Sequence, residues 1–280
     1  MTEPADILIE GAHILTSDPA QPEIARGRIT ITADRLHSVG PAEGAPPPAA
    51  RVIDGQGFIV LPGLVNVHLH AILTMVRGVA EDMGFAPAYT PGVPQGHMVR
   101  EEEAVALARL GALEAMKFGS TLINDTYVHQ HLTLPAMGAL GLRVTGCGRI
   151  HDVDFSGVSR GRWDYDTAIG RRTLDEALAL HQRWHGALDG RLGVQLAAHA
   201  PDTCSTDFLR EVRAARDATG MMVTTHLAQS PIEVERIAAR DGLTPAELLD
   251  EVGLLSDRLI GAHCIFMTED DITRAGRAGI

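Results

Sequence analysis

One stretch of the sequence decides the fold: Leu61-Pro62-Gly63-Leu64-Val65-Asn66-Val67-His68-Leu69-His70. It is a short apolar run that follows a Pro-Gly turn and ends in two histidines one residue apart. Successive side chains of a β-strand alternate between its two faces, so His68 and His70 are expected on one face, together with Asn66. Two imidazoles held side by side supply half of a four-coordinate shell for zinc or a similar cation. The spacing predicts a metal site, with a solvated strand end as the alternative.

The composition is that of a globular protein with a buried core. The chain has 280 residues, of which 45% are hydrophobic and 21% charged. Its formal net charge is -12 and its Lys and Arg residues do not cluster, so we expect no nucleic acid and no membrane as a partner. A small molecule is the expected partner, and association into a homo-oligomer stays open.

Cysteine usage and the N-terminus indicate the compartment. The three cysteines, Cys147, Cys204 and Cys264, are an odd number without Cys-x-x-Cys spacing, which predicts free, buried thiols in a reducing environment. The first residues lack a basic, apolar secretory signal, and no apolar run approaches the length that spans a membrane. We therefore expect a cytoplasmic protein.

Residues 1–60 are predicted to form a small β domain. Short apolar strands are expected at residues 6–15, 28–33, 52–54 and 58–60, separated by Gly, Pro and Asp turns. The proline-rich segment 41–48 is expected to be a surface loop.

From residue 61 the pattern changes to apolar strands that alternate with helical stretches, which is typical of βα units around a parallel sheet. After the histidine strand, further strands are expected at residues 120–125, 143–150, 192–198, 221–225 and 258–262. Helices are expected at 101–119, 132–140, 173–188 and 205–219, with further helix starts at Ser230, Thr244 and Thr268. The connection 71–100 is long enough to suggest a functional loop, and 151–168 is expected to be a polar loop.

Histidines stand at or next to the C-terminal ends of four of these strands: His70, His199, His226 and His263. The active site of a parallel (β/α) barrel is built at that end of the strands. Scattered core histidines would not favour one end. The sequence therefore predicts an α/β fold in which residues 61–280 form an incomplete (β/α)8 TIM-type barrel of about six βα units, preceded by the small β domain.

Several motifs together resemble a known family. They are Pro62–His70, Met75-Val76-Arg77-Gly78, Gly119–Asp125, His226-Leu227-Ala228 and Ala262-His263-Cys264. In combination the chain resembles a metal-dependent amidohydrolase of the cytosine deaminase-like and triazine-hydrolase branch. The resemblance extends over nearly the whole chain and implies a barrel enzyme that uses one divalent metal to activate a hydrolytic water.

The resemblance assigns roles position by position. His68, His70 and His226 match the metal ligands, His263 matches a catalytic histidine that assists substrate or water, and His199 resembles a substrate-contacting histidine. The expected cofactor is one divalent metal, zinc first, with iron, manganese and nickel as alternatives. Neutral histidines leave the charge of the cation uncompensated, which lowers the pKa of a bound water toward ~7.

Two departures from the family pattern stand out. The proton-shuttling glutamate of the family's deaminases, three residues beyond the fifth-strand histidine, is Gln229 here, and an amide does not exchange protons at neutral pH. Gln229 is expected to line the substrate pocket instead. Glu233 or Glu235 are candidate substitutes, although Glu233 fits a helix-capping role. The chain also stops at Ile280 before the family's eighth-strand aspartate, so we expect a truncated version of a longer enzyme with exposed apolar sheet edges.

Other candidate groups are interpreted as structural. His181 and His185 have helical i,i+4 spacing, but Gln182 stands where a metalloprotease has its glutamate, so a helix surface is expected. His129 and His131 are expected at the surface or lining a cleft. Cys264 follows His263 and is interpreted as a buried thiol rather than a nucleophile.

The sequence therefore predicts a metal-dependent hydrolase of non-peptide carbon-nitrogen bonds in a small cyclic or heteroaromatic substrate. The alternative is a truncated, catalytically inactive barrel that serves as an interaction or dimerisation partner.

Overall fold

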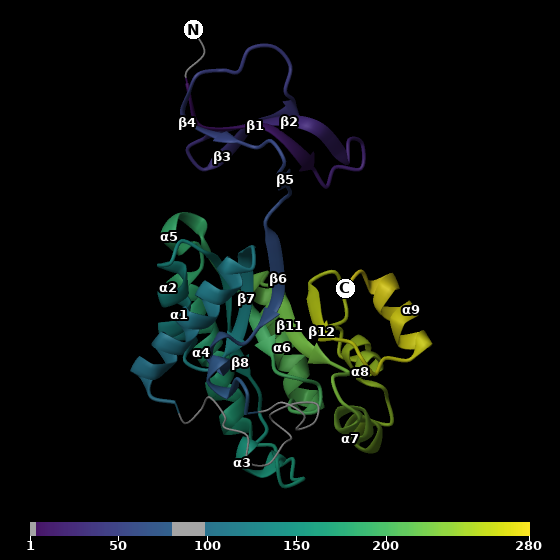
Figure 1. Cartoon of the computed structure of the whole chain (residues 1–280). Helices are drawn as coiled ribbons and strands as arrows, with labels where there is room; N and C mark the ends of the chain where they lie inside the picture. The colour runs from purple at the N-terminus through teal and green to yellow at the C-terminus, as the bar shows by residue number, and fades with distance from the viewer. Residues whose placement is uncertain (1–3, 80–98) are drawn as a thin grey trace. The chain divides into compact units, whose positions relative to one another are not determined.

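The computed structural model describes residues 4–79 and 99–280 (Figure 1). The chain divides into two compact units, Met1–Leu64 and Val65–Ile280. The long connection expected at residues 71–100 begins with a 3-10 helix, η1 (Ala71–Val76), and residues 80–98 of it lie outside the described part. No helix in the described ranges has both the length and the apolar character needed to cross a membrane.

The first unit is one sheet with the strand order β3-β2-β1-β4, in which β5 also pairs with β1. Its strands are β1 (Ala5–Leu15), β2 (Glu23–Thr32), β3 (Arg35–Pro41), β4 (Ala49–Asp54) and β5 (Ile59–Val60). Strand β3 was not predicted because its sequence mixes polar and apolar residues and contains Gly and Pro. Its residues are nearly all exposed, and its ladder to β2 and a 2.6 Å hydrogen bond between the hydroxyls of Thr30 and Ser38 hold it. Apolar side chains are exposed on both edge strands, as expected: Leu36 on β3 and Val52 on β4.

The second unit is built on a sheet with the order β12-β11-β10-β8-β7-β6, with β9 also paired to β8. The strands are β6 (Leu64–Leu69), β7 (Ser120–Tyr127), β8 (Arg143–Ile150), β9 (Leu192–Val194), β10 (Leu196–Ala198), β11 (Val223–Leu227) and β12 (Leu259–His263). The pairings from β7 to β12 are parallel. This sheet curves into a partial barrel, which confirms the predicted fold class (Figure 1).

Helices separate the strands of the second unit (Figure 1). They are α1 (Glu101–Lys117), α2 (Gln130–Gly138), α3 (Phe155–Val158), α4 (Thr167–Trp184), α5 (Ala187–Gly190), α6 (Thr206–Thr219), α7 (Pro231–Asp241), α8 (Pro245–Glu251) and α9 (Glu269–Ala278). The helix starts expected at Ser230, Thr244 and Thr268 are confirmed, because each side chain accepts the backbone N–H of the third helical residue.

Two apolar clusters pack the helices against the sheet. One contains Leu196, Leu209, Val223 and Leu248, and the other contains Ile72, Ile123, Leu134 and Val144. The fourth strand, expected as one piece, is broken between β9 and β10 at Gln195. The side-chain amide of Gln195 donates to Oδ1 of Asn124 at 2.8 Å. Helix α4 begins earlier than expected because Asp166 caps it.

Candidate metal centre

Three histidines from distant parts of the chain converge in the second unit. His68 lies on β6, His70 directly follows that strand, and His226 lies on β11. Each offers a ring nitrogen within 4.8 Å of the other two, and Nε2 of His70 lies 3.1 Å from Nε2 of His226. The ring of His68 completes the group, with its centroid 4.6 Å from that of His70 and 4.9 Å from that of His226. The structure thus brings together the three residues predicted as metal ligands.

Backbone carbonyls orient two of these rings. The Nδ1–H group of His70 donates to the carbonyl of Thr126 on β7, at 2.5 Å. The Nδ1–H group of His226 donates to the carbonyl of His199, which follows β10. Because each carbonyl holds the proton on Nδ1, the lone pair of each Nε2 points at the shared site. Parallel neighbours in the sheet therefore set both the tautomer and the direction of the two imidazoles.

The three imidazoles are uncharged at neutral pH. Burial first, and the neighbouring histidines second, lower the pKa of His70 to about 3 and that of His68 to about 4. Burial also holds the pKa of His226 well below its ordinary value, with His70 and His68 adding to the effect. A neutral imidazole is the form that binds a metal, so protons do not compete for these nitrogens at neutral pH.

The arrangement fits one divalent cation. Both ring nitrogens of His68 are buried and have no hydrogen-bond partner among the described residues, which is costly for a polar side chain without a ligand. Two nitrogens on one tetrahedral zinc, each at about 2.05 Å, lie roughly 3.3 Å apart. The 3.1 Å between the Nε2 atoms of His70 and His226 agrees with that geometry. The donor set is of the type that zinc and similar transition metals prefer.

His199 lies next to this cluster, and both of its ring nitrogens have hydrogen-bond partners within the protein. Its ring centroid is 4.7 Å from that of His226. Arg149 donates to Nε2 at 2.9 Å, and Nδ1–H donates to the hydroxyl of Thr203 at 2.8 Å. Burial and the charge of Arg149 hold the pKa of His199 well below its ordinary value. His199 is thus a neutral side chain of fixed orientation whose backbone carbonyl also orients His226.

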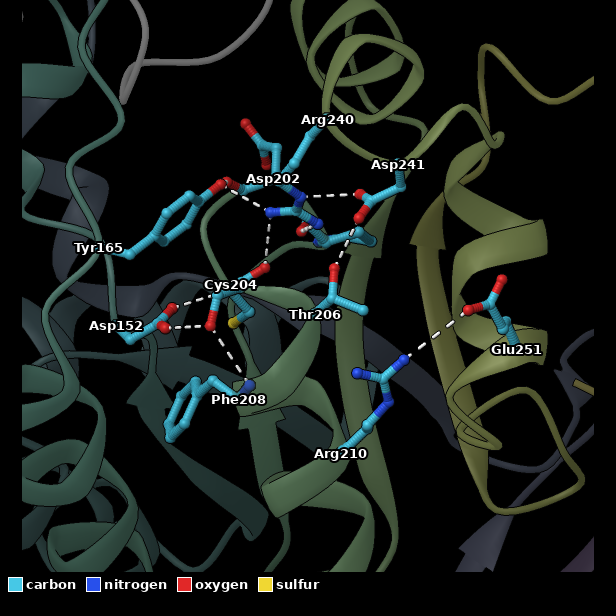
Figure 2. A network of polar contacts seen from close by, with 12 residues as sticks. Asp152, Tyr165, Asp202, Cys204, Thr206, Phe208, Arg210, Arg240, Asp241 and Glu251 are labelled. Atoms are coloured by element: carbon cyan, nitrogen blue, oxygen red, sulfur yellow. Dashed lines mark hydrogen bonds and ion pairs between the residues drawn. The ribbon is translucent and has the colours of Figure 1, made fainter.

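The turn that carries His199 is held by a polar network that the sequence did not reveal (Figure 2). The guanidinium of Arg240, from α7, donates to the carbonyls of Pro201 and Cys204 at 3.1 and 3.0 Å and to the hydroxyl of Tyr165 at 2.6 Å. That hydroxyl in turn donates to the carbonyl of Asp202 at 2.7 Å. One arginine therefore fixes several backbone groups of the turn after β10. Arg240 lies on α7, far along the chain from the turn after β10 that it holds. No local sequence motif therefore predicted this contact.

His263 ends β12 and faces the same cluster. Its ring centroid lies 5.0 Å from that of His68, and its ring stacks on that of His226 at 5.4 Å. Its backbone is left-handed, with φ 75°, as is that of Cys264, with φ 57°. The prediction of a buried thiol is wrong for Cys264, which is only partly buried, whereas Cys147 and Cys204 are buried. The strand has ended at His263, so the alternation of faces does not extend to Cys264.

Gln229 is buried in the turn after β11, three residues beyond His226. Of the two candidate substitutes for a shuttling carboxylate, Glu233 is already engaged by the backbone. Glu233 is fully buried and its two oxygens accept the backbone N–H groups of Ala228 and Gln229 at 2.8 and 2.9 Å. Ser230 caps α7 as expected, but the Glu233 side chain reaches beyond the cap to this turn. Glu235 is exposed on α7.

Asp125, near the end of β7, is a buried carboxyl that sequence reasoning left without a role. Its Oδ1 accepts the backbone N–H of Ala71 at 2.6 Å, directly after His70, and its Oδ2 accepts from the side-chain amide of Gln130. Burial raises the pKa of Asp125 to about 6, although both hydrogen bonds oppose the shift. Asp125 therefore fixes the backbone that follows the first two histidines.

Replacing Asp125 with asparagine tests that description. Because the folded pKa lies above that of an unfolded aspartate, Asp125 favours the folded state below pH 3.8, and this contribution is lost as pH rises through 6. A shift of this size corresponds to about 3 kcal/mol. Asparagine keeps the bond to Ala71, and its N–H can donate to Oε1 of Gln130 once that amide turns over; this oxygen has no hydrogen-bond partner among the described residues. We expect the unfolding free energy of the wild type to fall relative to that of D125N as pH rises from 4 to 7, because only the wild type loses the contribution of Asp125; urea profiles that stay parallel across this range would contradict the assignment.

The remaining histidine pairs lie outside the cluster. His129 and His131 line a cavity of about 670 Å³, together with Tyr127, Arg149 and Trp184, which confirms the expected cleft-lining position. His181 and His185 stack at 4.6 Å at the end of α4, and Nδ1 of His185 accepts the backbone N–H of Val194 at 3.1 Å. Among the described residues, His68, His70 and His226 are the group whose geometry could hold a metal ion.

A family comparison agrees with this geometry. A model of the amidohydrolase family matches residues 59–280. The chain belongs to the amidohydrolase family. This confirms the resemblance that the sequence motifs suggested.

Relatives of this amidohydrolase include deaminases. A 5'-deoxyadenosine deaminase from Methanosarcina barkeri is 30% identical over 277 residues, which are 99% of this chain and 61% of the relative. The crystal structure of an adenosine deaminase from Xanthomonas campestris with bound zinc has a TM-score of 0.82 at 25% identity, covering 99% of this chain and 62% of the other. A triazine hydrolase variant has the same fold, with a TM-score of 0.84 at 21% identity, covering 98% and 63%. The amidohydrolase chain spans about three fifths of the length of these relatives.

Proposed function

We propose that the protein is a metal-dependent hydrolase of a non-peptide carbon-nitrogen bond in a small heteroaromatic substrate. The observation that carries the proposal is the convergence of three neutral imidazoles, with His68 left unpartnered by the described residues. The deaminase relatives favour an amino-substituted purine as the first substrate class to test, with the amino group released as ammonia. Zinc is the first metal to test, because the adenosine deaminase structure holds it.

His68, His70 and His226 would hold the cation. A divalent cation bound there supplies Lewis-acid activation of a water at neutral pH. The carbonyls of Thr126 and His199 keep the two Nε2 lone pairs aimed at it. His263, stacked on His226 and exposed, is placed to orient water or to bond a ring substituent of the substrate. His199 and Gln229 would contact the substrate, His199 as a neutral ring held by Arg149 and Thr203.

The test combines metal content with turnover. The purified chain is stripped of metal, loaded with Zn²⁺, and incubated with 5'-deoxyadenosine, adenosine, amino-pyrimidines and triazines while ammonia or amine release is recorded. We expect one ion per chain and hydrolysis of at least one amino-substituted ring, lost on removal of the metal. Stoichiometric metal without turnover on any of these compounds would contradict the hydrolase and favour an inactive, interacting barrel. Absence of metal binding would contradict the assignment of the three histidines.

A further inference from the structure

The backbone around the candidate site contains a cluster of strained residues. Ala228, His263 and Cys264 all adopt the left-handed conformation, with φ values of 47°, 75° and 57°. A residue with a Cβ rarely occupies this region, and such strain persists only where the surrounding structure imposes it. Ala228 stands two residues beyond His226, and His263 stacks on the ring of His226. Contacts from the surrounding structure must therefore stabilise the turn after β11, which contains Ala228, and the turn after β12, which begins at His263.

Hydrogen bonds join the two turns to each other. The N–H group of Cys264 donates to the carbonyl of Leu227 at 2.9 Å, and the N–H group of Phe266 donates to the carbonyl of Ala228 at 2.9 Å. The turn after β12, which carries His263, thus rests on the turn after β11. A change in the conformation of Ala228 would move the acceptors that hold the segment after His263.

One side chain holds the first of these turns. Oε1 of Glu233 accepts the N–H group of Ala228 at 2.8 Å, and Oε2 accepts that of Gln229 at 2.9 Å. Glu233 has no exposed surface and is held by its position in α7, where Ser230 caps the helix. A carboxylate is the one side chain group of this length that offers two parallel acceptors to two consecutive N–H groups.

We propose that Glu233 is the positioning residue of this face of the barrel: its carboxylate fixes the turn of Ala228 and Gln229 and, through that turn, the placement of His263. The inference concerns backbone geometry and deepens the proposed function, since Gln229 and His263 are the groups assigned there to substrate and water. Glu233 acts through these residues and is not itself expected to contact the substrate.

Glutamine at position 233 is the sharpest variant. It matches glutamate in size but offers one acceptor oxygen, and its NH2 group opposes the second backbone N–H group. In E233Q we expect amide hydrogen exchange at Ala228 and Gln229 to accelerate roughly 10- to 100-fold, because one of two buried backbone N–H groups loses its acceptor. Exchange at Cys264 and Phe266 is expected to accelerate as well. E235Q is the matched control on the same helix, and its exposed side chain should leave all four amides unchanged.

A second variant separates positioning from general destabilisation. Glycine adopts the left-handed conformation without the Cβ penalty, so A228G should let the turn persist without the carboxylate. In E233Q/A228G, protection at Cys264 and Phe266 is expected to return toward wild type, while the amide at position 229 stays fast. Unchanged exchange in E233Q, or uniform acceleration across the barrel without rescue by A228G, would overturn the proposal. These measurements need neither metal nor substrate, so they stand apart from a failure of the hydrolase assignment.

Discussion

Replacing His226 with alanine is expected to lower the affinity of the protein for Zn²⁺ or Co²⁺ by roughly 10²- to 10³-fold. Structural zinc sites bind with about 10–16 kcal/mol, which spread over four ligands is about 2.5–4 kcal/mol each, or roughly two to three orders of magnitude in Kd. His226 is a demanding test because it lies 156 residues from His70 in the sequence, yet the two Nε2 atoms are 3.1 Å apart. Only the folded barrel brings them together.

Isothermal titration of the metal-free protein measures this loss, and the visible spectrum of bound Co²⁺ reports the ligand number. The matched control is H263A, which removes a ring that stacks on His226 but is not one of the three converging groups. We expect H263A to change the affinity less than about threefold. If H226A binds as tightly as the wild type, or if both variants lose affinity equally, the three-histidine site is wrong.

The convergence of these histidines was predictable because period-two spacing and parallel topology are readable in the sequence. His68 and His70 share a strand face by their spacing, and His199, His226 and His263 each follow an apolar run of strand length. Once those runs are the strands of one parallel barrel, their C-terminal ends meet at one face. The polar residues at these ends were therefore expected near one another before any distance was known.

The supporting residues were not predictable in the same way. Asp125 and Arg240 act on backbone groups of other segments, Ala71 and the turn after β10. No spacing rule connects a carboxyl or a guanidinium to an N–H or carbonyl group so distant in sequence, because the link exists only after the strands have paired. Glu233 was assigned a local cap for this reason, and its contacts with Ala228 and Gln229 emerged only from the structure.

The strained backbone of the two turns beside the site could not be predicted from the sequence either. Ala228, His263 and Cys264 are left-handed without being glycine, so composition gave no signal for them. Their conformation is imposed by tertiary hydrogen bonds to Glu233 and between the two turns. For the same reason the strand alternation that correctly grouped His68 and His70 failed at Cys264, one residue past the end of β12.

Replacing Gln229 with glutamate is expected to raise the rate at which ammonia is released from an amino-substituted purine. The family resemblance implies a glutamate at this position in deaminases, and a carboxylate can accept a proton from water and return it to a leaving nitrogen, which an amide cannot do. A positioned general acid-base group contributes typically 10²- to 10⁴-fold. We therefore expect kcat for 5'-deoxyadenosine or adenosine to rise by roughly 10²-fold or more in Q229E, with little change in metal content.

Steady-state kinetics across pH separates this effect from better binding. A new acid-base group should raise kcat and introduce a titration in its pH profile, whereas a change in substrate contact would move KM. Q229M, whose side chain is of similar length but lacks the hydrogen-bonding amide, is the control. It should raise KM without adding a titrating group to the pH profile of kcat. An unchanged or lower kcat in Q229E would contradict the prediction: the leaving group would then depart without a proton from position 229. The natural substrate would in that case be a ring whose leaving group needs no protonation, a different class from the amino-purines of the deaminase relatives.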